Sequence, residues 1–140
     1  MKAVLLLLLR ITTGALLVIW GLIKVEAPEA AIRVSEKYYG GLISAEMLQP
    51  ILGWSQIALG AFVILGLMRV IAYPLQAIVL VVGAAAIWKY LADPLGMYLL
   101  NEETRQVLFF PSSTVAVASL IMLAFRSDDT IALDRLFFRR

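Results

Sequence analysis

Four long apolar stretches alternate with shorter polar segments along the 140 residues of the chain. They are Ala3–Ile23, interrupted only by Arg10, followed by Ile51–Met68, Ala72–Trp88 and Val107–Phe125. A helix needs about 20 residues to cross a bilayer, and within lipid its backbone amides must bond to one another. The pattern therefore predicts an all-α fold. We expect a transmembrane four-helix antiparallel bundle, one membrane domain over residues 1–140, with spans at approximately 3–24, 50–69, 73–91 and 107–126.

Two polar segments carry patterns of their own. In residues 25–49, Pro28 and Glu29 suit the first turn of a helix and Gly40–Gly41 its end, which predicts a short interfacial helix in the first loop. A tight turn is expected at Arg69–Tyr73, with Pro74 opening the third span.

The last stretch, 127–140, mixes leucines and phenylalanines with arginines. This mixture predicts an amphipathic C-terminal tail that forms an interfacial helix against anionic lipid, with Ser127 or Asp128 at its N-cap. Docking on a partner subunit is the alternative interpretation of the same pattern.

Small residues share one face of each predicted span. In the first span Arg10, Gly14, Leu17, Gly21 and Lys24 follow one another at intervals of 4, 3, 4 and 3 residues, so they form one stripe of a helix. Glycines on such a stripe let a neighbouring helix approach closely, and a base within an apolar run usually faces the bundle interior. We expect these small-residue faces to point inward in all four spans.

The composition of the chain indicates a membrane protein and excludes several classes of cofactor and catalytic site. Hydrophobic residues make up 62% of the chain, above the roughly 45–50% of soluble domains, and the mean hydropathy is +0.92. The chain contains no His and no Cys, which excludes bis-His haem, thiolate metal sites, disulfides and catalysis by Cys or His. We expect no metal site and no nucleic-acid partner; membrane lipids and a larger membrane complex or a homo-oligomer are the expected partners.

Charge sets the expected orientation. Seven bases and three carboxylates fall on the side of both termini and the turn after the second span, against five bases and seven carboxylates on the other side. The two sides thus carry net charges of +4 and −2. The positive-inside rule then places both termini in the cytoplasm, in a multi-pass protein of the cell inner (plasma) membrane.

Several polar and aromatic residues within or beside the spans are candidates for a ligand-binding or polar packing face. They are Arg10, Lys24, Gln56, Gln76, Trp54, Trp88 and Tyr90. Arg10 either reaches the headgroups with its long side chain or makes an inward contact. Gln56 either joins helices, through a bond of about 0.6–2 kcal/mol, or contacts a ligand or proton path. Lys24 is most simply an interface anchor, and Trp88 and Tyr90 an aromatic belt.

The order of four motifs resembles the DoxX/DoxD/MauE group of small four-helix membrane proteins. The motifs are R-x3-G-x6-G-x2-K from Arg10 through Gly14 and Gly21 to Lys24, then Pro28-Glu29-Ala30, Tyr38-Tyr39-Gly40, and Gln56-x3-Gly60-x5-Gly66 followed by Arg69. The chain departs from the family pattern at Gln56, where relatives often have a glutamate, so the second span lacks that titratable carboxylate.

The resemblance implies an accessory role beside a membrane or periplasmic redox system. DoxD-like members form the small subunit of a thiosulfate:quinone oxidoreductase, and MauE-like members support maturation of a periplasmic dehydrogenase. We therefore expect a non-catalytic membrane accessory subunit or assembly factor. The alternative is a quinone- or lipid-binding subunit of an oxidoreductase, with a quinone or lipid as the candidate ligand. A channel or small transporter is a poorer interpretation, because no carboxylate is expected within the membrane.

Overall fold

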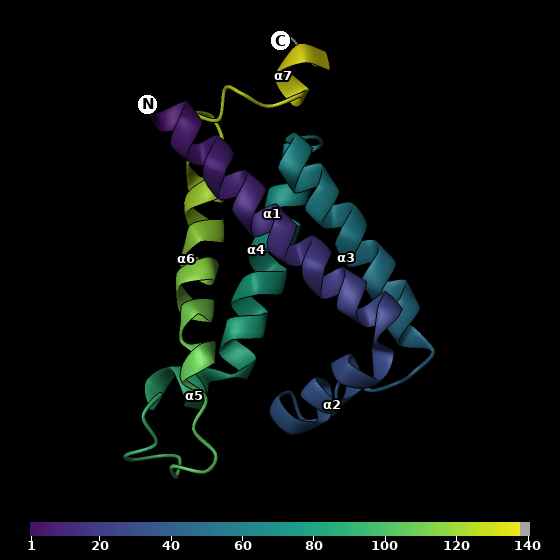
Figure 1. Cartoon of the computed structure of the whole chain (residues 1–140). Helices are drawn as coiled ribbons and strands as arrows, with labels where there is room; N and C mark the ends of the chain where they lie inside the picture. Colours follow the sequence, from purple (N-terminus) through teal and green to yellow (C-terminus); the bar gives the residue numbers. More distant parts are fainter. Residues whose placement is uncertain (138–140) are drawn as a thin grey trace.

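The computed structural model describes residues 1–137, and every regular element in that range is helical (Figure 1). The elements are α1 (Lys2–Glu26), α2 (Pro28–Tyr38), α3 (Leu48–Leu65), α4 (Arg69–Ala86), α5 (Trp88–Ala92), the 3₁₀ helix η1 (Val107–Phe109), α6 (Pro111–Ala124) and α7 (Asp134–Phe137). Residues 138–140, which include Arg139 and Arg140 of the predicted tail, lie outside the described residues.

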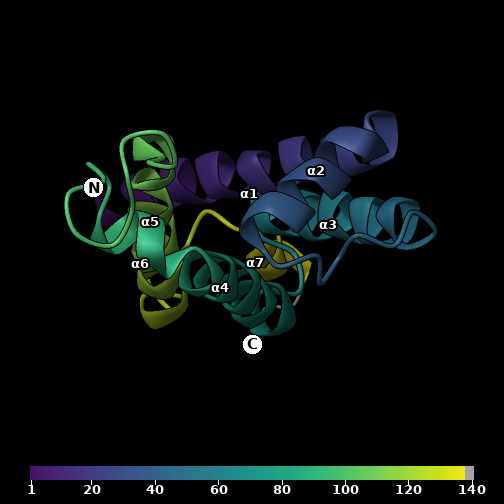
Figure 2. The same ribbon diagram turned by 90° about the horizontal axis from the view of Figure 1, so that it is seen from below.

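Four helical segments are long and apolar enough to cross a membrane: α1, α3, α4 and the combined η1–α6 segment. Successive spans run in opposite directions, which confirms the predicted four-helix transmembrane bundle (Figure 1). α1 packs mainly on α3 and α4 mainly on α6, so the bundle consists of two helix pairs (Figure 2).

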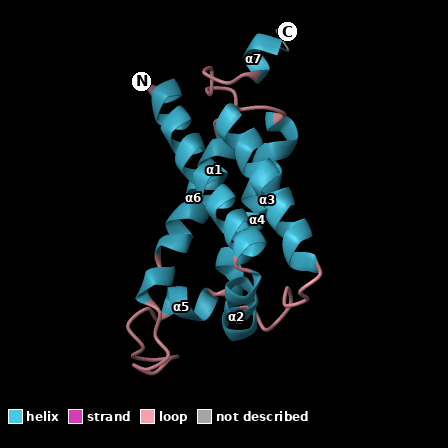
Figure 3. Cartoon of the chain, turned by 45° about the vertical axis from the view of Figure 1, so that its right-hand side comes forward, coloured by secondary structure: helices cyan, strands magenta, loops and turns pink. Residues whose placement is uncertain are grey.

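The two ends of the bundle differ in what they contain (Figure 3). The N-terminus, the α3–α4 turn (residues 66–68) and the tail (residues 125–137) meet at one end, which we call the tail end. α2, α5 and η1 lie at the opposite end, which we call the loop end.

α1 and α3 approach so closely that their contact requires glycine. A Cβ on Gly14 would lie 2.8 Å from the Gly60 carbonyl oxygen, and one on Gly21 would lie 2.7 Å from the Gly53 carbonyl oxygen. Each helix carries its two glycines seven residues apart, so the antiparallel register brings glycine opposite glycine twice. The predicted small-residue faces of the first two spans are confirmed as an interface.

The small-residue face of α4 behaves differently. A Cβ added at Gly83 would meet no atom within 4 Å, so no helix of the described chain packs against this glycine. The expectation that all four small-residue faces point inward was therefore wrong for this position. α4 contacts α3 much less than α1 contacts α3, and the small-residue face of α4 is uncovered at Gly83.

The turn between the second and third spans lies earlier than predicted. α3 ends at Leu65, and the chain reverses through Gly66 and Met68, whose φ angles are +67° and +49°. α4 then begins at Arg69, so the predicted turn at Arg69–Tyr73 was wrong and Pro74 lies inside the helix. Glycine tolerates the left-handed conformation, so the chain turns at Gly66, eight residues before Pro74.

The loop end is held by an aromatic cluster. α2 forms as predicted, with Pro28 in its first turn. Tyr38 at the end of α2, Tyr90 of α5 and Phe109 of η1 pack edge to face, with ring centroids 4.7 to 5.5 Å apart. α4 ends at Ala86, and α5 begins two residues later, so the predicted span 73–91 is divided between two helices.

The tail differs most from its prediction. Its only described helix is α7, which begins at Asp134, so neither Ser127 nor Asp128 caps a helix there. Residues 126–133 instead cross the tail end of the bundle without helical structure, and Asp129 and Ala132 are buried. The tail is thus part of the folded domain.

Candidate functional site

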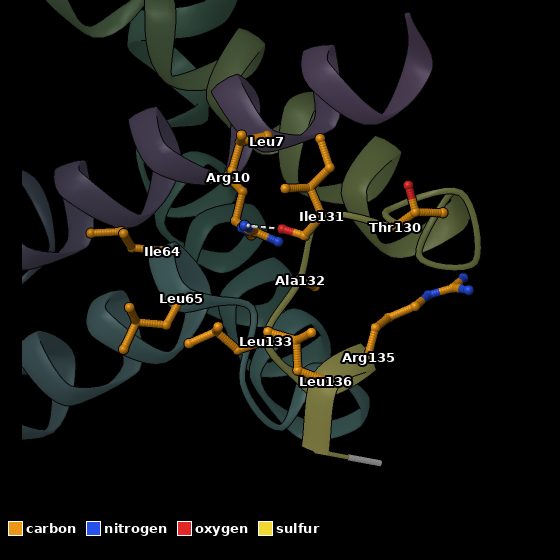
Figure 4. Close-up of a pocket in the computed structure, with 10 residues that line it drawn as sticks. All are labelled: Leu7, Arg10, Ile64, Leu65, Thr130, Ile131, Ala132, Leu133, Arg135 and Leu136. Carbon is orange, nitrogen blue, oxygen red and sulfur yellow. Dashed lines mark hydrogen bonds between the residues drawn. The ribbon is translucent and has the colours of Figure 1, made fainter. Parts of the chain in front are cut away.

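A buried ion pair joins the first span to the tail. Arg10 and Asp129 are only 3% and 2% exposed, and their side chains meet with Arg10 Nη1 3.0 Å from Asp129 Oδ2. Arg10 Nη2 also donates a 2.7 Å bond to the Ile131 carbonyl oxygen (Figure 4). Of the two interpretations of Arg10, the structure supports the inward contact, because its guanidinium is buried and paired within the chain.

The ion pair belongs to a larger network. The Tyr73 hydroxyl of α4 donates a hydrogen bond to Asp129, and Arg69 Nη1 lies 3.9 Å from the same carboxylate. Arg69 Nη1 also donates to the carbonyl oxygens of Arg126 and Asp129, at 3.1 and 2.7 Å. A buried charge is tolerated only when it is paired and hydrogen-bonded, and here α1, α4 and the tail together supply the partners.

Asp134 links the tail to the start of α4. Its carboxylate accepts the backbone N–H groups of Met68 and Arg69, at 2.8 and 2.9 Å, and Arg69 Nε donates to it at 3.4 Å. The first N–H groups of a helix lack partners within the helix, and a carboxylate there also offsets the positive end of the helix dipole. Asp134 thus acts as the N-terminal cap of α4 from another part of the chain.

Backbone bonds complete the docking of the tail on α3. The N–H of Leu133 donates to the Leu65 carbonyl oxygen at 3.2 Å, and that of Asp134 to the Gly66 carbonyl oxygen at 3.1 Å. A Cβ on Gly66 would lie 2.5 Å from Arg10 Nη1 and 2.7 Å from the Ala132 side chain. Gly66 therefore provides both the turn and the space in which Arg10 and the tail meet.

Polar side chains continue from this network into the bundle. The Thr13 hydroxyl, one turn from Arg10, contacts the Met122 sulfur at 3.3 Å, and the buried Ser119 hydroxyl donates to its own helix. Gln76, one turn from Tyr73, is fully buried, and neither atom of its amide has a partner among the described residues. An unpaired buried amide is costly, so Gln76 marks a place where a polar group would be stabilised.

The other five predicted candidates make no hydrogen bond to the tail-end network. Lys24 Nζ donates a 2.7 Å bond to Gln56 Oε1, which joins α1 to α3 at a point 14 residues along α1 from Arg10 and near the end of that helix at Glu26. Trp54 and Trp88 are 61% and 54% exposed. Tyr90 packs in the aromatic cluster. The seven candidates therefore occupy separate parts of the bundle and form no single binding face.

Lys24 and Gln56 thus have defined roles. The ammonium group of Lys24 is bonded to Gln56, and Gln56 joins helices as one of its two interpretations predicted, whereas the position of Lys24 at the membrane interface stays a prediction.

Four residues of the network are absent from the predicted candidates, although one signal in the sequence points toward them. Asp129, Asp134, Tyr73 and Arg69 are not among the seven candidates, and Asp129 and Asp134 enter the sequence analysis only through the charge balance that sets the orientation. A lone arginine within an apolar run needs a counter-charge, which is the signal that could have led to a carboxylate near a span end. The span pattern does not say which carboxylate, because Asp129 reaches Arg10 only through the fold of the tail.

Asp93, at the loop end, is a second carboxylate with a structural role. It accepts the backbone N–H groups of four successive residues, Met97 to Leu100, at 2.7 to 3.0 Å. Burial acts to raise the pKa of Asp93, but the four donors outweigh it and hold that pKa far below its usual range. The carboxylate thus folds the loop after α5.

Comparison of the chain with protein-family models, with curated proteins and with solved structures gave no match. The site is therefore interpreted from its own geometry. Its charged groups are arranged to hold three parts of the chain together, and within residues 1–137 no three acidic side chains gather as metal ligands would.

Proposed function

We propose that the chain is a non-catalytic membrane accessory subunit or assembly factor that associates with a larger membrane redox complex. The observation that carries this proposal is the tail-end network of Arg10, Arg69, Asp129 and Asp134, in which each charge is bonded within the chain. A group that transfers protons or guides ions must be accessible to those protons or ions. These four charges are instead bonded to other parts of the chain and stabilise the fold. A fixed bundle with apolar outer faces is suited to docking beside other membrane subunits.

The redox part of the proposal comes from the resemblance to the DoxX/DoxD/MauE group. The same proposal places the chain in the inner membrane with both termini cytoplasmic, because the tail end carries the excess of bases. Large apolar side chains are exposed on the outer faces of all four spans, and any of these faces is available to lipid or to a partner.

A quinone- or lipid-binding subunit is the second candidate, and Gln76 favours it. A carbonyl group that entered the bundle beside Gln76 would supply the partner that its amide lacks. A quinone retained through purification by the wild-type chain and lost in Gln76→Leu would support this function. Equal quinone retention by both proteins would show that Gln76 does not bind the quinone.

Site-specific photo-crosslinking in native membranes tests the first proposal. A photo-reactive residue is placed in turn at Leu5, Trp54, Val82 and Val117, which are exposed on α1, α3, α4 and α6, with buried Leu17 as the matched control position. We expect one or two exposed positions to give a cross-link to a larger membrane protein while Leu17 gives none. If all four exposed positions react only with lipid, the chain is not a subunit of a complex.

A further inference from the structure

A pocket of about 480 Å³ lies at the tail end, between α1, α3 and the tail (Figure 4). Seven of its ten lining residues are apolar, and the other three are Arg10, Thr130 and Arg135. No acidic residue lines it. The pocket therefore combines hydrocarbon walls with two guanidinium groups, a combination that suits an amphiphile with a negative head.

The two arginines contribute differently. Arg10 lies in the wall of the pocket, and its buried Nε has no hydrogen-bond partner although its terminal nitrogens are bonded to Asp129 and Ile131. Arg135 borders the pocket from α7. Among the described residues it forms no salt bridge, and the one hydrogen bond of its side chain goes to the Ser127 carbonyl oxygen. Arg135 thus supplies a positive charge that the fold has not neutralised.

The position of the pocket identifies the class of amphiphile. Leu7 lies near the start of the first span and Leu65 at the end of the second, so the pocket lies where the apolar spans give way to polar chain. Leu136 and Phe137 on α7 are more than 70% exposed, so α7 carries an apolar surface next to the pocket. A lipid headgroup is found at this depth, whereas a free phosphate would not use the apolar walls.

We propose that this pocket binds the phosphate headgroup of an anionic phospholipid, with Arg135 pairing with the phosphate and the lipid chains lying against Leu7, Ile64 and Leu136. The proposal is independent of the proposed partner complex, because it concerns a lipid that the isolated chain would hold. Apart from Arg10, the residues that hold the lipid are not among the seven candidates for a ligand-binding face, although Arg135 and Leu136 belong to the tail that is predicted to lie against anionic lipid.

Lipid retention measured by native mass spectrometry tests this proposal. The full chain is delipidated in detergent and then titrated with phosphatidylglycerol or with phosphatidylcholine of the same acyl chains. We expect phosphatidylglycerol to be retained preferentially, and Arg135→Gln to reduce that retention about fivefold, the usual effect of one basic residue at an anionic membrane surface. Arg33→Gln, which removes an exposed arginine at the loop end, is the matched control and should retain lipid as the wild type does.

Three outcomes would overturn the proposal. They are equal retention of the two lipids, equal loss in the Arg33 and Arg135 variants, and displacement of the bound lipid by inorganic phosphate alone, which would indicate a small-anion site. Leu7→Trp gives a second readout, because it reduces the pocket volume without changing charge and should also lower phosphatidylglycerol retention. Circular dichroism of each variant distinguishes lost lipid binding from lost folding.

Discussion

The two ends of the bundle are held together by different chemistry. At the tail end, charged side chains from α1, α4 and the tail meet in a buried network centred on Arg10 and Asp129. At the loop end, three aromatic rings join α2, α5 and η1, and a single Lys24–Gln56 bond joins α1 to α3. Each end brings together segments that lie far apart in the sequence.

The two ends should therefore respond differently to substitution. Removing one member of the Arg10–Asp129 pair leaves the other charge buried without its partner, which is among the largest single penalties in proteins. Removing a ring or an amide at the loop end loses packing or one hydrogen bond, and the remaining groups stay compatible with their surroundings. We therefore expect substitutions at the tail end to destabilise the chain most.

Asp129→Ala should have the largest effect. It leaves the Arg10 guanidinium buried and unpaired, and we expect a loss of about 3–5 kcal/mol in the free energy of unfolding. The measurement is the loss of helical circular dichroism as SDS is added to detergent micelles. Asp128→Ala is the matched control, since the neighbouring carboxylate makes no side-chain contact with the network and should change stability by less than about 0.5 kcal/mol.

A double variant distinguishes a lost charge pair from a lost tail contact. Arg10→Leu combined with Asp129→Leu removes both charges and should recover much of the stability lost in Asp129→Ala, because no unpaired charge remains. If the double variant is as unstable as the single one, the penalty comes from tail docking and not from a buried charge.

Gly60→Val should have the next largest effect. The added Cβ would lie 2.6 Å from the Gly14 carbonyl oxygen, so α1 and α3 must separate, at a cost of about 1–3 kcal/mol. Gly83→Ala is the control, because no atom lies within 4 Å of its Cβ, and alanine should stabilise α4 by up to about 1 kcal/mol. The same SDS titration compares the two, and a destabilising Gly83→Ala would mean that α4 has an unseen contact.

The α1–α3 contact and the tail-end network also differ in how far the sequence predicts them. The faces that meet in the α1–α3 contact follow from the pattern, since two glycines lie seven residues apart in each of two apolar runs, but which spans pair and in what register comes from the structure. The bundle and its four spans follow in the same way from apolar run length. Such features depend on run length or on residue spacing, and the spacing along the chain determines which residues share a helix face.

The tail-end site could be predicted only in part. Arg10 within an apolar run indicates a buried charge, but its partner lies 119 residues away in a segment with no regular structure. The same applies to Asp134, which caps a helix that begins 65 residues earlier. Contacts of this kind depend on how irregular chain crosses the bundle, and neither hydropathy nor spacing encodes that path.

Asp134→Ala should have a smaller and more local effect at the tail end. It removes the carboxylate that accepts the Met68 and Arg69 N–H groups, and loss of a helix cap costs about 0.5–2 kcal/mol. Hydrogen exchange of those two amides should accelerate. Asp134→Asn separates the two roles of the carboxylate, because asparagine caps helices well but does not pair with Arg69; protection that is lost equally in both variants would show that the ion pair matters more than the cap.

The smallest effect is expected at the loop-end side, for the bond between Lys24 and Gln56. Interhelical hydrogen bonds in membrane proteins contribute about 0.6 kcal/mol on average, so the coupling between Lys24→Met and Gln56→Leu should be near that value. A double-mutant cycle in SDS-induced unfolding measures it without counting the separate cost of each substitution. A coupling of several kcal/mol would show that the two ends depend on charge pairing equally, because Lys24 would then be as dependent on its partner as Arg10 is on Asp129.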